Sequence, residues 1–483
     1  MSFESALVVS VCFITVVVLI LTSKMNRAIA ALTGALITYF ALSIFDGKDF
    51  SDFVNLLFST EEEGYVNLHS LIFIIAMMMI LQIADDAGVF QFIAVYAIKL
   101  SRGDPIWLLV IFCFLAVFSS AILNPITTVM LLIPLTITIS RILDSNPTPY
   151  ILTQAVLVNL GGSIFSISSI PNILIVTSTG ITFLEFFLNV GIFSLLVVCF
   201  TIPLFIFLYK PSLSRAEEVL VQTLMQFDIW NIVQSKRLLI LSIGALVILM
   251  LSFIIIPSEI MTSDIIALTI ALVLIILASF DDIDPAAIIK KFDYELIFYL
   301  MGIFIIAGAL ELVGIINTLG NVLQNLGGDF SPVIQVLAVL WISAILSSSI
   351  DNIPITKVLI PLVHEFIPLN ISSDVQKRYY YGLAIGSNWG DNLTPFGDNI
   401  LVVQLSEKNK RPITMMSFWK LGFITTVYQL FLTSLYFILL FELIIGLIVI
   451  TALIIFLLIL FALYQTTEIV SLKINRLRLL ITG

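Results

Sequence analysis

The chain has 483 residues, of which 60% are hydrophobic and only 11% are charged, and its formal net charge is −10. With a mean hydropathy of +1.14, its apolar surface cannot be hidden in the core of a soluble domain, so the composition predicts an all-α polytopic membrane protein. No basic stripe offers a surface for nucleic acid, and we expect no nucleic-acid partner.

Catalytic signatures are missing from the sequence. The three cysteines lie far apart without C-x-x-C spacing, and no P-loop, metal-ligand motif or nucleophile–base pair is visible. We therefore expect neither an enzyme nor a cofactor, other than a coupling ion.

Apolar runs in the first half of the chain predict five spans and one hairpin. Two shorter arms, which meet at Asn124-Pro125, predict a hairpin that enters and leaves by the same membrane face. A polar linker, 210–237, follows this half. In chain order, the predicted elements are 5–22, 28–45, 66–84, the arms 105–123 and 126–140, then 150–178 and 186–209.

The second half of the chain repeats this series. The halves align at a separation of about 226–232 residues, which pairs Gly88 with Gly314 and Asn124 with Asn352. Each half crosses the membrane an odd number of times, so the two repeats have inverted topology, and the hairpin tips meet near the midplane. The predicted elements are 238–256, 263–280, 293–312, the hairpin 331–369, 379–405, 417–440 and an extra C-terminal span within 441–465, about 11 spans in all.

Lysine and arginine in the short loops predict the orientation. Most of these residues fall on one side, which should be cytoplasmic, in a multi-pass protein of the plasma membrane, whereas Lys377 and Arg378 fall on the other. The residues that define this side are Lys24, Arg27, Lys99, Arg102, Arg141, Lys210, Arg215, Lys236, Arg237, Lys290, Lys291, Lys408, Lys410 and Arg411.

Each half contains two polar breaks inside apolar helix, at 118–136 and 159–172 and again at 346–362 and 387–399. Such breaks free backbone groups and expose half-helix ends, which can hold an ion or solute; the alternative is that small polar residues merely pack helices closely. The candidate binding residues are Ser120, Asn124, Thr127, Thr128, Asn159, Gly161, Gly162, Ser163, Asn172, Ser348, Asn352, Thr356, Asn388, Gly390, Asn392 and Thr394.

Carboxylates occur only in the breaks of the second half, as Asp351, Asp391 and Asp398. An ionisable group at membrane depth is costly and is a functional candidate, since it can bind Na⁺ or carry a proton. We predict a candidate Na⁺ site at Asp351, Asn352 and Asp391. The alternative for Asp351 is that it caps a half-helix or pairs with Lys357.

The other charged residues of interest are one lysine with two alternative roles and three acidic residues at the ends of spans. Lys357 is a counter-ion for Asp351 or a positive contact for an anionic substrate. Asp85, Asp86 and Glu311 end the third span of each half, and we interpret them as interfacial residues.

Several segments carry a family resemblance over roughly residues 20–435. The chain resembles the ion transporter superfamily of arsenite permeases, D-type sodium/proton antiporters, P-protein-like permeases and citrate or dicarboxylate transporters. The segments are NRAIAALTGA at 26–35, Ser120 to Pro134, Asn159 to Ile175, DYELIFYLMGIF at 293–304, DNIPIT at 351–356 and GDNLTPFG at 390–397.

The resemblance implies a division into domains, and the sequence also departs from the family pattern at several positions. It implies a homodimer with a scaffold (1–104 and 238–330), a transport unit that slides as an elevator (105–209 and 331–440), and an extra span and tail (441–483). The family's first-half aspartates are missing from Leu123-Asn124-Pro125 and from 168–172. Paired Ser-Asn-Thr motifs are also missing, which argues against a close citrate or succinate carrier.

The sequence therefore predicts a secondary active transporter that moves a small anion or metalloid coupled to Na⁺ or H⁺. The alternative is a Na⁺/H⁺ antiporter. An ion channel fits less well, because it needs a continuous pore rather than two opposed hairpins.

Overall fold

The computed structural model describes residues 2–451, with gaps, and beyond them only residues 477 and 481. The gaps are 23, 216, 227, 229, 231, 232, 234, 258, 259, 281–289, 369, 396–398 and 412. Asp398 and most of the predicted C-terminal span, 441–465, therefore lie outside the described residues. The described part is helical, and no strand occurs in it.

The first half of the chain folds into helices that follow the predicted series. The span predicted at 150–178 is divided into α8 and α9 by the polar break. The helices are α1 (Phe3–Leu21), α2 (Arg27–Asp46), α3 (Phe50–Phe58), α4 (Val66–Asp86), α5 (Val89–Leu100), α6 (Pro105–Ile122), α7 (Pro125–Ile142), α8 (Thr148–Gly161), α9 (Ile170–Thr179), α10 (Phe183–Phe186) and α11 (Ile192–Tyr209).

The linker and the second half continue the pattern, with a second divided span at α20 and α21. The elements are α12 (Glu218–Gln226), α13 (Lys236–Ile255), α14 (Ser263–Ser279), α16 (Tyr294–Leu312), α17 (Ile315–Gly327), α18 (Pro332–Ser349), α19 (Asn352–Phe366), α20 (Ser373–Trp389), the 3₁₀ turn η4 (Gly390–Leu393), α21 (Ile400–Lys408) and α22 (Met415–Phe441).

Ten of the described helices are long and apolar enough to cross a membrane. They include both arms of the first hairpin and the first arm of the second, whereas the two limbs of each divided span are each too short to be counted. Because side chains on many of these helices remain exposed on the outside of the fold, the protein presents an apolar surface to lipid. The prediction of an all-α, multi-pass membrane protein is confirmed.

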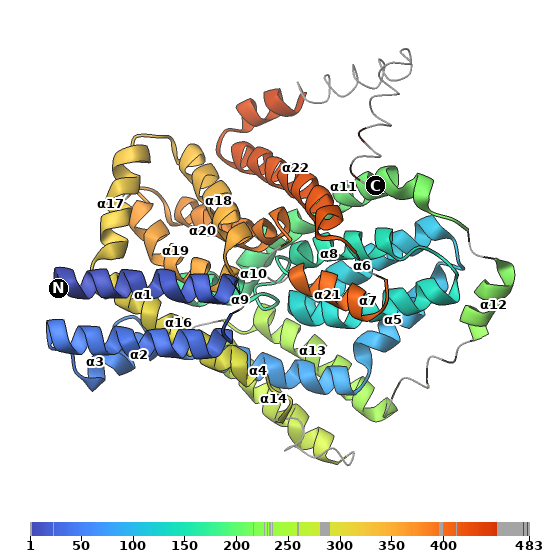
Figure 1. Ribbon diagram of the computed structural model, residues 1–483, viewed down its shortest axis with the longest axis horizontal. Coiled ribbons are helices and arrows are strands. Elements are labelled where there is room, and N and C mark those ends of the chain that lie inside the picture. The colour runs from blue at the N-terminus through green and yellow to red at the C-terminus, as the bar shows by residue number, and fades with distance from the viewer. Residues whose placement is uncertain are drawn as a thin grey trace.

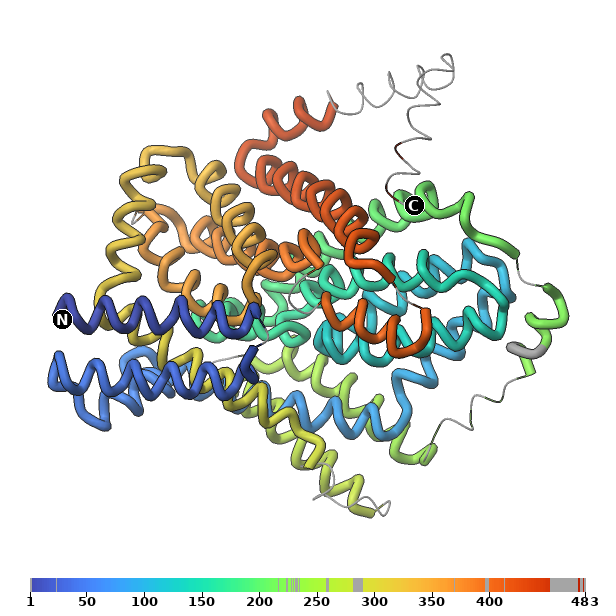
Figure 2. Tube along the Cα trace, in the orientation of Figure 1, coloured from blue at the N-terminus to red at the C-terminus, as the bar shows by residue number. Residues whose placement is uncertain are grey.

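The two hairpins enter the molecule from opposite ends. In Figure 1, α6 and α7 extend from the right toward the centre, whereas α18 and α19 extend from the left, and the helix-to-helix turns of both lie near the middle. The same arrangement is visible along the chain trace in Figure 2, where the first hairpin is cyan and the second is gold to orange. Opposed hairpins are what an inverted repeat predicts.

Helix packing recurs in matched pairs across the two halves. α2 packs on α16 as α14 packs on α4, and α6 packs on α8 as α18 packs on α20. The second limb of each divided span packs against the hairpin of the other half, α9 on α19 and α21 on α7. The halves thus exchange equivalent contacts, which supports the duplication seen in the sequence.

Two glycines place each hairpin against its divided span. A Cβ on Gly161 would lie 2.5 Å from the carbonyl oxygen of Val117, and a Cβ on Gly390 would lie 2.3 Å from that of Ala344. Only glycine allows the backbones to approach this closely. The contact is the same in both halves and relates their hairpins by 227 residues, since 344 minus 117 is 227.

This register corrects one detail of the sequence alignment. Asn124 was paired there with Asn352, but a shift of 227 pairs it with Asp351. Capping agrees, because Asn124 is the N-cap of α7 and Asp351 is the N-cap of α19. The position of the tip carboxylate is therefore occupied by a neutral amide in the first half.

Candidate functional site

The tip of the first hairpin is built by local sequence. Leu123 leaves the helical conformation, and the side-chain oxygen of Asn124 accepts a hydrogen bond from the backbone N–H of Thr127 at 2.7 Å. Pro125 follows at the first helical position, where its missing N–H costs nothing. The chain therefore reverses within two residues, and the N-terminus of α7 is placed at the tip.

The tip of the second hairpin uses a carboxylate in the same role. Oδ1 of Asp351 accepts a hydrogen bond from the backbone N–H of Ile353 at 3.0 Å. The predicted alternative, that Asp351 caps a half-helix, is thus what the structure shows. Capping engages one carboxylate oxygen with this N–H and leaves the other oxygen for a second partner.

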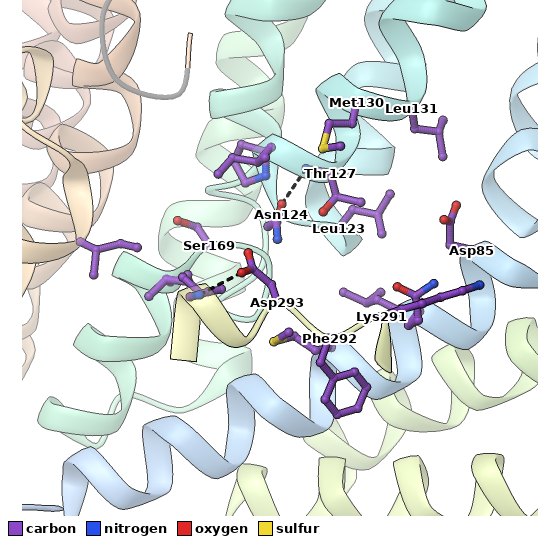
Figure 3. A pocket seen from close by; sticks show the side chains of 18 of the residues that line it. Asp85, Leu123, Asn124, Thr127, Met130, Leu131, Ser169, Lys291, Phe292 and Asp293 are labelled. Atoms are coloured by element: carbon purple, nitrogen blue, oxygen red, sulfur yellow. Dashed lines mark hydrogen bonds between the residues drawn. The ribbon is translucent and has the colours of Figure 1, made fainter. Parts of the chain in front are cut away.

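A cavity of about 670 Å³ lies between the two tips. Both tips line it, together with the start of α9 at Ser169 and the helices α4 and α16 of the predicted scaffold. Figure 3 shows Asn124, Thr127 and Ser169 on one side of this space, with Lys291 and Asp293 on another. The cavity thus lies between the segments predicted to form the scaffold and those predicted to form the transport unit, and Arg27 and Lys291 place it toward the face predicted to be cytoplasmic.

The charged residues that line the cavity are partly paired. Arg27 contacts Asp293 at 3.4 Å (Nη2 to Oδ2) and Glu295 at 3.2 Å (Nε to Oε1). Lys291 contacts Asp86 at 2.6 Å. Among the described lining residues, Asp85, Asp293 and Asp351 are acidic and only Arg27 and Lys291 are basic. The lining therefore has one negative charge more than it has positive charges.

Asp351 also interacts with residues of the predicted scaffold. The hydroxyl of Tyr299 and the charge of Arg27 both interact with its carboxylate. The guanidinium of Arg27 lies over the Tyr299 ring, 5.6 Å from its centroid. The tip carboxylate, α2 and α16 therefore meet at one edge of the cavity.

Asp391 lies behind the second tip and does not line the cavity. Its Oδ1 accepts a hydrogen bond from Ser347 Oγ at 2.6 Å, and its Oδ2 accepts one from Asn352 Nδ2 at 2.7 Å. Because Asn352 follows Asp351 directly, the three residues of the predicted Na⁺ site are brought together. The structure places one carboxylate in the cavity and one beneath it, with an amide between them.

Five predicted binding residues hold the two divided spans together. Asn159 Nδ2 donates to Asn392 Oδ1 at 2.9 Å, Asn388 Nδ2 donates to Asn172 Oδ1 at 2.7 Å, and Trp389 Nε1 donates to Ser163 Oγ at 3.0 Å. All of these side chains are buried. Gly161, Gly162 and Gly390 belong to the same close packing, so in this conformation the group joins the two repeats.

We expect Asn392→Ala to destabilise the protein. The substitution leaves the Nδ2 group of Asn159 without its acceptor, at a cost of about 1–3 kcal/mol, and removes a further hydrogen bond to the carbonyl of Val156. The measurement is the thermal unfolding midpoint in detergent, with Asn409→Ala as control, because the side chain of Asn409 donates to the carbonyl of Leu405 within its own helix end. Equal midpoints for the two variants would contradict this role.

Four further predicted residues donate hydrogen bonds to backbone carbonyls. Ser120 donates to the carbonyl of Val158, Thr128 to that of Asn124, Ser348 to that of Ile345, and Thr394 to that of Ser348. Thr356 is buried, and its hydroxyl has no hydrogen bond with the described residues. Lys357 is not paired with Asp351 here, since its Nζ donates to Asn67 on α4 at 2.6 Å.

Sequence reasoning did not select the scaffold side of the cavity. Arg27, Asp293 and Tyr299 all lie in segments that carry the family resemblance, NRAIAALTGA and DYELIFYLMGIF, and that was the available signal. Asp85 was interpreted as interfacial, but it lines the cavity, where Gln91 Nε2 donates to its carboxylate at 2.9 Å.

An all-helical membrane fold whose two opposed hairpins share one polar cavity defines a membrane transporter. Residues 17–378 match the family CitMHS, described as citrate transporter, and the chain belongs to this family. The chain is 26% identical to the "46 kDa membrane protein" of Mycobacterium leprae, over 88% of this chain and 96% of that one. It is 25% identical to an uncharacterized transporter of Mycobacterium tuberculosis, with the same coverage.

Two further similarities extend this result. The human P protein is 23% identical over 84% of this chain and 56% of its own length. Among solved structures, the YdaH transporter of Alcanivorax borkumensis, reported to have an unusual topology, has a TM-score of 0.54 at 14% identity, over 80% of this chain and 88% of that one. The resemblance to a transporter superfamily is thereby confirmed.

Proposed function

We propose that this chain is a secondary active transporter that moves a small anion or metalloid across the membrane, coupled to Na⁺ or H⁺. The observation that carries the proposal is the composition of the cavity. It is lined by the N-terminal ends of three helices, α7, α9 and α19, and its wall has one more acidic side chain than basic side chains.

The three helix N-termini favour the binding of an anionic or strongly polar solute. Asn124, Ser169 and Asp351 are the N-caps of α7, α9 and α19, and all three line the cavity. Each helix directs about half a positive charge toward its N-terminus, and three such ends around one space favour an anion without a dedicated basic side chain. The cavity volume, about 670 Å³, is sufficient for a small solute with water.

In this proposal the carboxylates bind the coupling cation. Asp351 binds Na⁺ or H⁺ at the tip, and Asn352 and Asp391 support it from behind. A cation there would offset the negative charge that otherwise repels an anionic solute, so the two would bind together. Carboxylate, amide and hydroxyl oxygens are suitable ligands for a hard cation.

The charge balance of the lining also favours a second candidate, Na⁺/H⁺ antiport. Both basic groups of the cavity, Arg27 and Lys291, are already paired with carboxylates. Asp85 and Asp351 then remain to exchange one cation for another, and no solute is needed. By resemblance, either activity would occur in a homodimer whose transport unit slides past the scaffold.

The test is reconstitution in liposomes that contain a pH-sensitive dye. Na⁺, arsenite, citrate and smaller carboxylates are added one at a time, with and without an imposed proton or sodium gradient. We expect one of the anions or arsenite to accumulate against its own gradient only when a cation gradient is present.

Two other results would replace this proposal. If Na⁺ alone dissipates the proton gradient, the chain is an antiporter. If a solute equilibrates but never accumulates, no ion gradient drives it and the transport is not secondary active.

A further inference from the structure

The side of the interface opposite to the cavity is closed by polar contacts. On the first turns of α4, Asn67 accepts a hydrogen bond from Lys357 Nζ at 2.6 Å, and Ser70 Oγ lies 2.8 Å from Thr177 Oγ1 on α9. The last turns of the same helix, from Met78 to Asp85, line the cavity instead. One scaffold helix is therefore in contact with the transport unit at one end and separated from it at the other.

Lys357 contacts residues of the predicted scaffold at the closed end. Its ammonium group lies 5.2 Å from the centroid of the Phe304 ring on α16. Asn67 is itself fixed, because its Nδ2 donates to the carbonyl of Leu56 at 3.3 Å. Glu311 and Glu63 contribute negative charge nearby, but no ion pair of Lys357 within 4.0 Å is found among the described residues. The cation is thus stabilised by an amide and a ring.

The residues at this closed end are the counterparts, in the second repeat, of residues that line the open cavity. With the hairpins shifted by 227 residues, Lys357 corresponds to Met130, as Pro361 corresponds to Pro134. With the third spans shifted by 226, the lining residues of α4 have counterparts on α16. Met78, Leu81 and Asp85 correspond to Phe304, Ala307 and Glu311.

All four first-half members of these pairs, Met130, Met78, Leu81 and Asp85, line the cavity that is open here. Both third spans are followed by a glycine with positive φ, Gly88 at 77° and Gly314 at 81°, so the local geometry is also matched. In an inverted repeat, the counterparts line the opening on the other face when the first opening closes.

We propose that a second cavity, lined by Lys357, Phe304, Ala307 and Glu311, opens on the opposite membrane face when the contact between Lys357 and Asn67 breaks, and that Lys357 binds the anionic group of the solute there. This inference rests on the proposed function, since it assumes alternating access and an anionic solute. It assigns to Lys357 a role in one conformation only.

The second repeat has a lysine, Lys357, where the first repeat has a methionine, Met130, so the two openings differ chemically. The present cavity has Met130 at this position and a net negative lining, whereas in the second cavity the ammonium group of Lys357 would balance the carboxylate of Glu311. A fixed positive charge raises the local concentration of small anions and their rate of capture. The anion would therefore be captured more effectively at the face opposite to the present opening.

The test measures accessibility and needs no knowledge of the substrate. Cys12, Cys113 and Cys199 are replaced by Ala, and Ala307→Cys or Leu81→Cys is introduced as a reporter. Membrane vesicles of both orientations are treated with an anionic thiol reagent, sulfonatoethyl methanethiosulfonate, and with its trimethylammonium analogue. We expect the Leu81→Cys reporter to react from the predicted cytoplasmic face and the Ala307→Cys reporter from the opposite face.

Two substitutions then examine the role of Lys357. Asn67→Ala removes a charge-assisted hydrogen bond and should speed the reaction of the Ala307→Cys reporter roughly tenfold. Lys357→Met, which copies the first repeat, should abolish the preference of this reporter for the anionic reagent. Trp341→Phe is the matched control, because Trp341 Nε1 bonds to Ser434 within the transport unit, and it should change neither rate.

The inference is overturned if the Ala307→Cys reporter stays unreactive from the opposite face in the Asn67→Ala protein, or if both reagents react alike with Lys357 present. Should the cysteine-free chain fail to fold, the wild-type and Asn67→Ala chains are treated with an impermeant amine reagent, and Lys357 is assayed by peptide mapping. An unlabelled Lys357 in both would equally contradict the second cavity. Reactive reporters in a protein that moves no solute in liposomes would refute the proposed function and not the cavity.

Discussion

Replacement of Asp351 by Asn is expected to abolish cation-coupled transport while the protein remains folded. The side-chain oxygen of Asn can still accept the hydrogen bond from Ile353, because Asn and Asp are nearly equal as N-caps. The chain itself shows this, since Asn124 caps α7 at the equivalent tip. The substitution therefore removes a charge and leaves the shape of the tip unchanged.

The expected loss is about 10- to 150-fold in the rate of gradient-driven uptake, since a ligand bond to a charged group contributes roughly 1.5–3 kcal/mol. The measurement is initial uptake into liposomes with and without a cation gradient, at matched protein content. The Asp351→Asn protein should lose the gradient-dependent part, and its unfolding midpoint in detergent should stay close to that of the wild type.

Asn124→Asp is the matched control for this experiment. It adds a carboxylate at the equivalent position of the other tip, where capping is equally preserved. If the coupling cation binds at Asp351 specifically, Asn124→Asp should not restore coupling to the Asp351→Asn protein. An Asp351→Asn protein with full coupled activity would remove Asp351 from the mechanism.

Gly390→Ala is expected to prevent correct assembly of the transport unit. A Cβ at this position would lie 2.3 Å from the carbonyl oxygen and 2.6 Å from the Cα of Ala344. Both are backbone atoms of α18, so no side chain can move aside, and the hairpin must separate from the divided span. Overpacking of this kind costs about 3 kcal/mol or more, and the hydrogen bonds of Ser347 to Ser387 and Asp391 would be lost with it.

The effect is measured as the folded yield and the unfolding midpoint after extraction in detergent. Gly161→Ala, the equivalent change in the first repeat, should have a similar effect, because its Cβ would meet the backbone of Val117. Gly244→Ala is the control, since no atom lies within 4 Å of its Cβ and Ala favours helix by about 1 kcal/mol. A Gly390→Ala protein as stable as the Gly244→Ala protein would show that the hairpin tolerates separation.

Elements whose signal is local were predictable from the sequence. Apolar runs of about 20 residues identify the spans, and Asn124-Pro125 and Asp351-Asn352 identify the tips, because a cap and the helix it begins are neighbours in the chain. The duplication was visible for the same reason, since each repeat carries its breaks in the same order. Its register was not, because similar residues at 351 and 352 can be aligned in two ways.

What the polar residues do was decided by tertiary structure. Asn159 and Asn124 are equally plausible ligands in the sequence, yet one bonds across to the other repeat and the other lines the cavity. Lys357 is close to Asp351 in the chain, but its ammonium group lies on the scaffold. The sequence by itself determined a duplicated, hairpin-containing membrane protein. Only the packing of distant helices decided which side chains face the cavity, because burial and hydrogen-bond partners depend on residues more than 200 positions away.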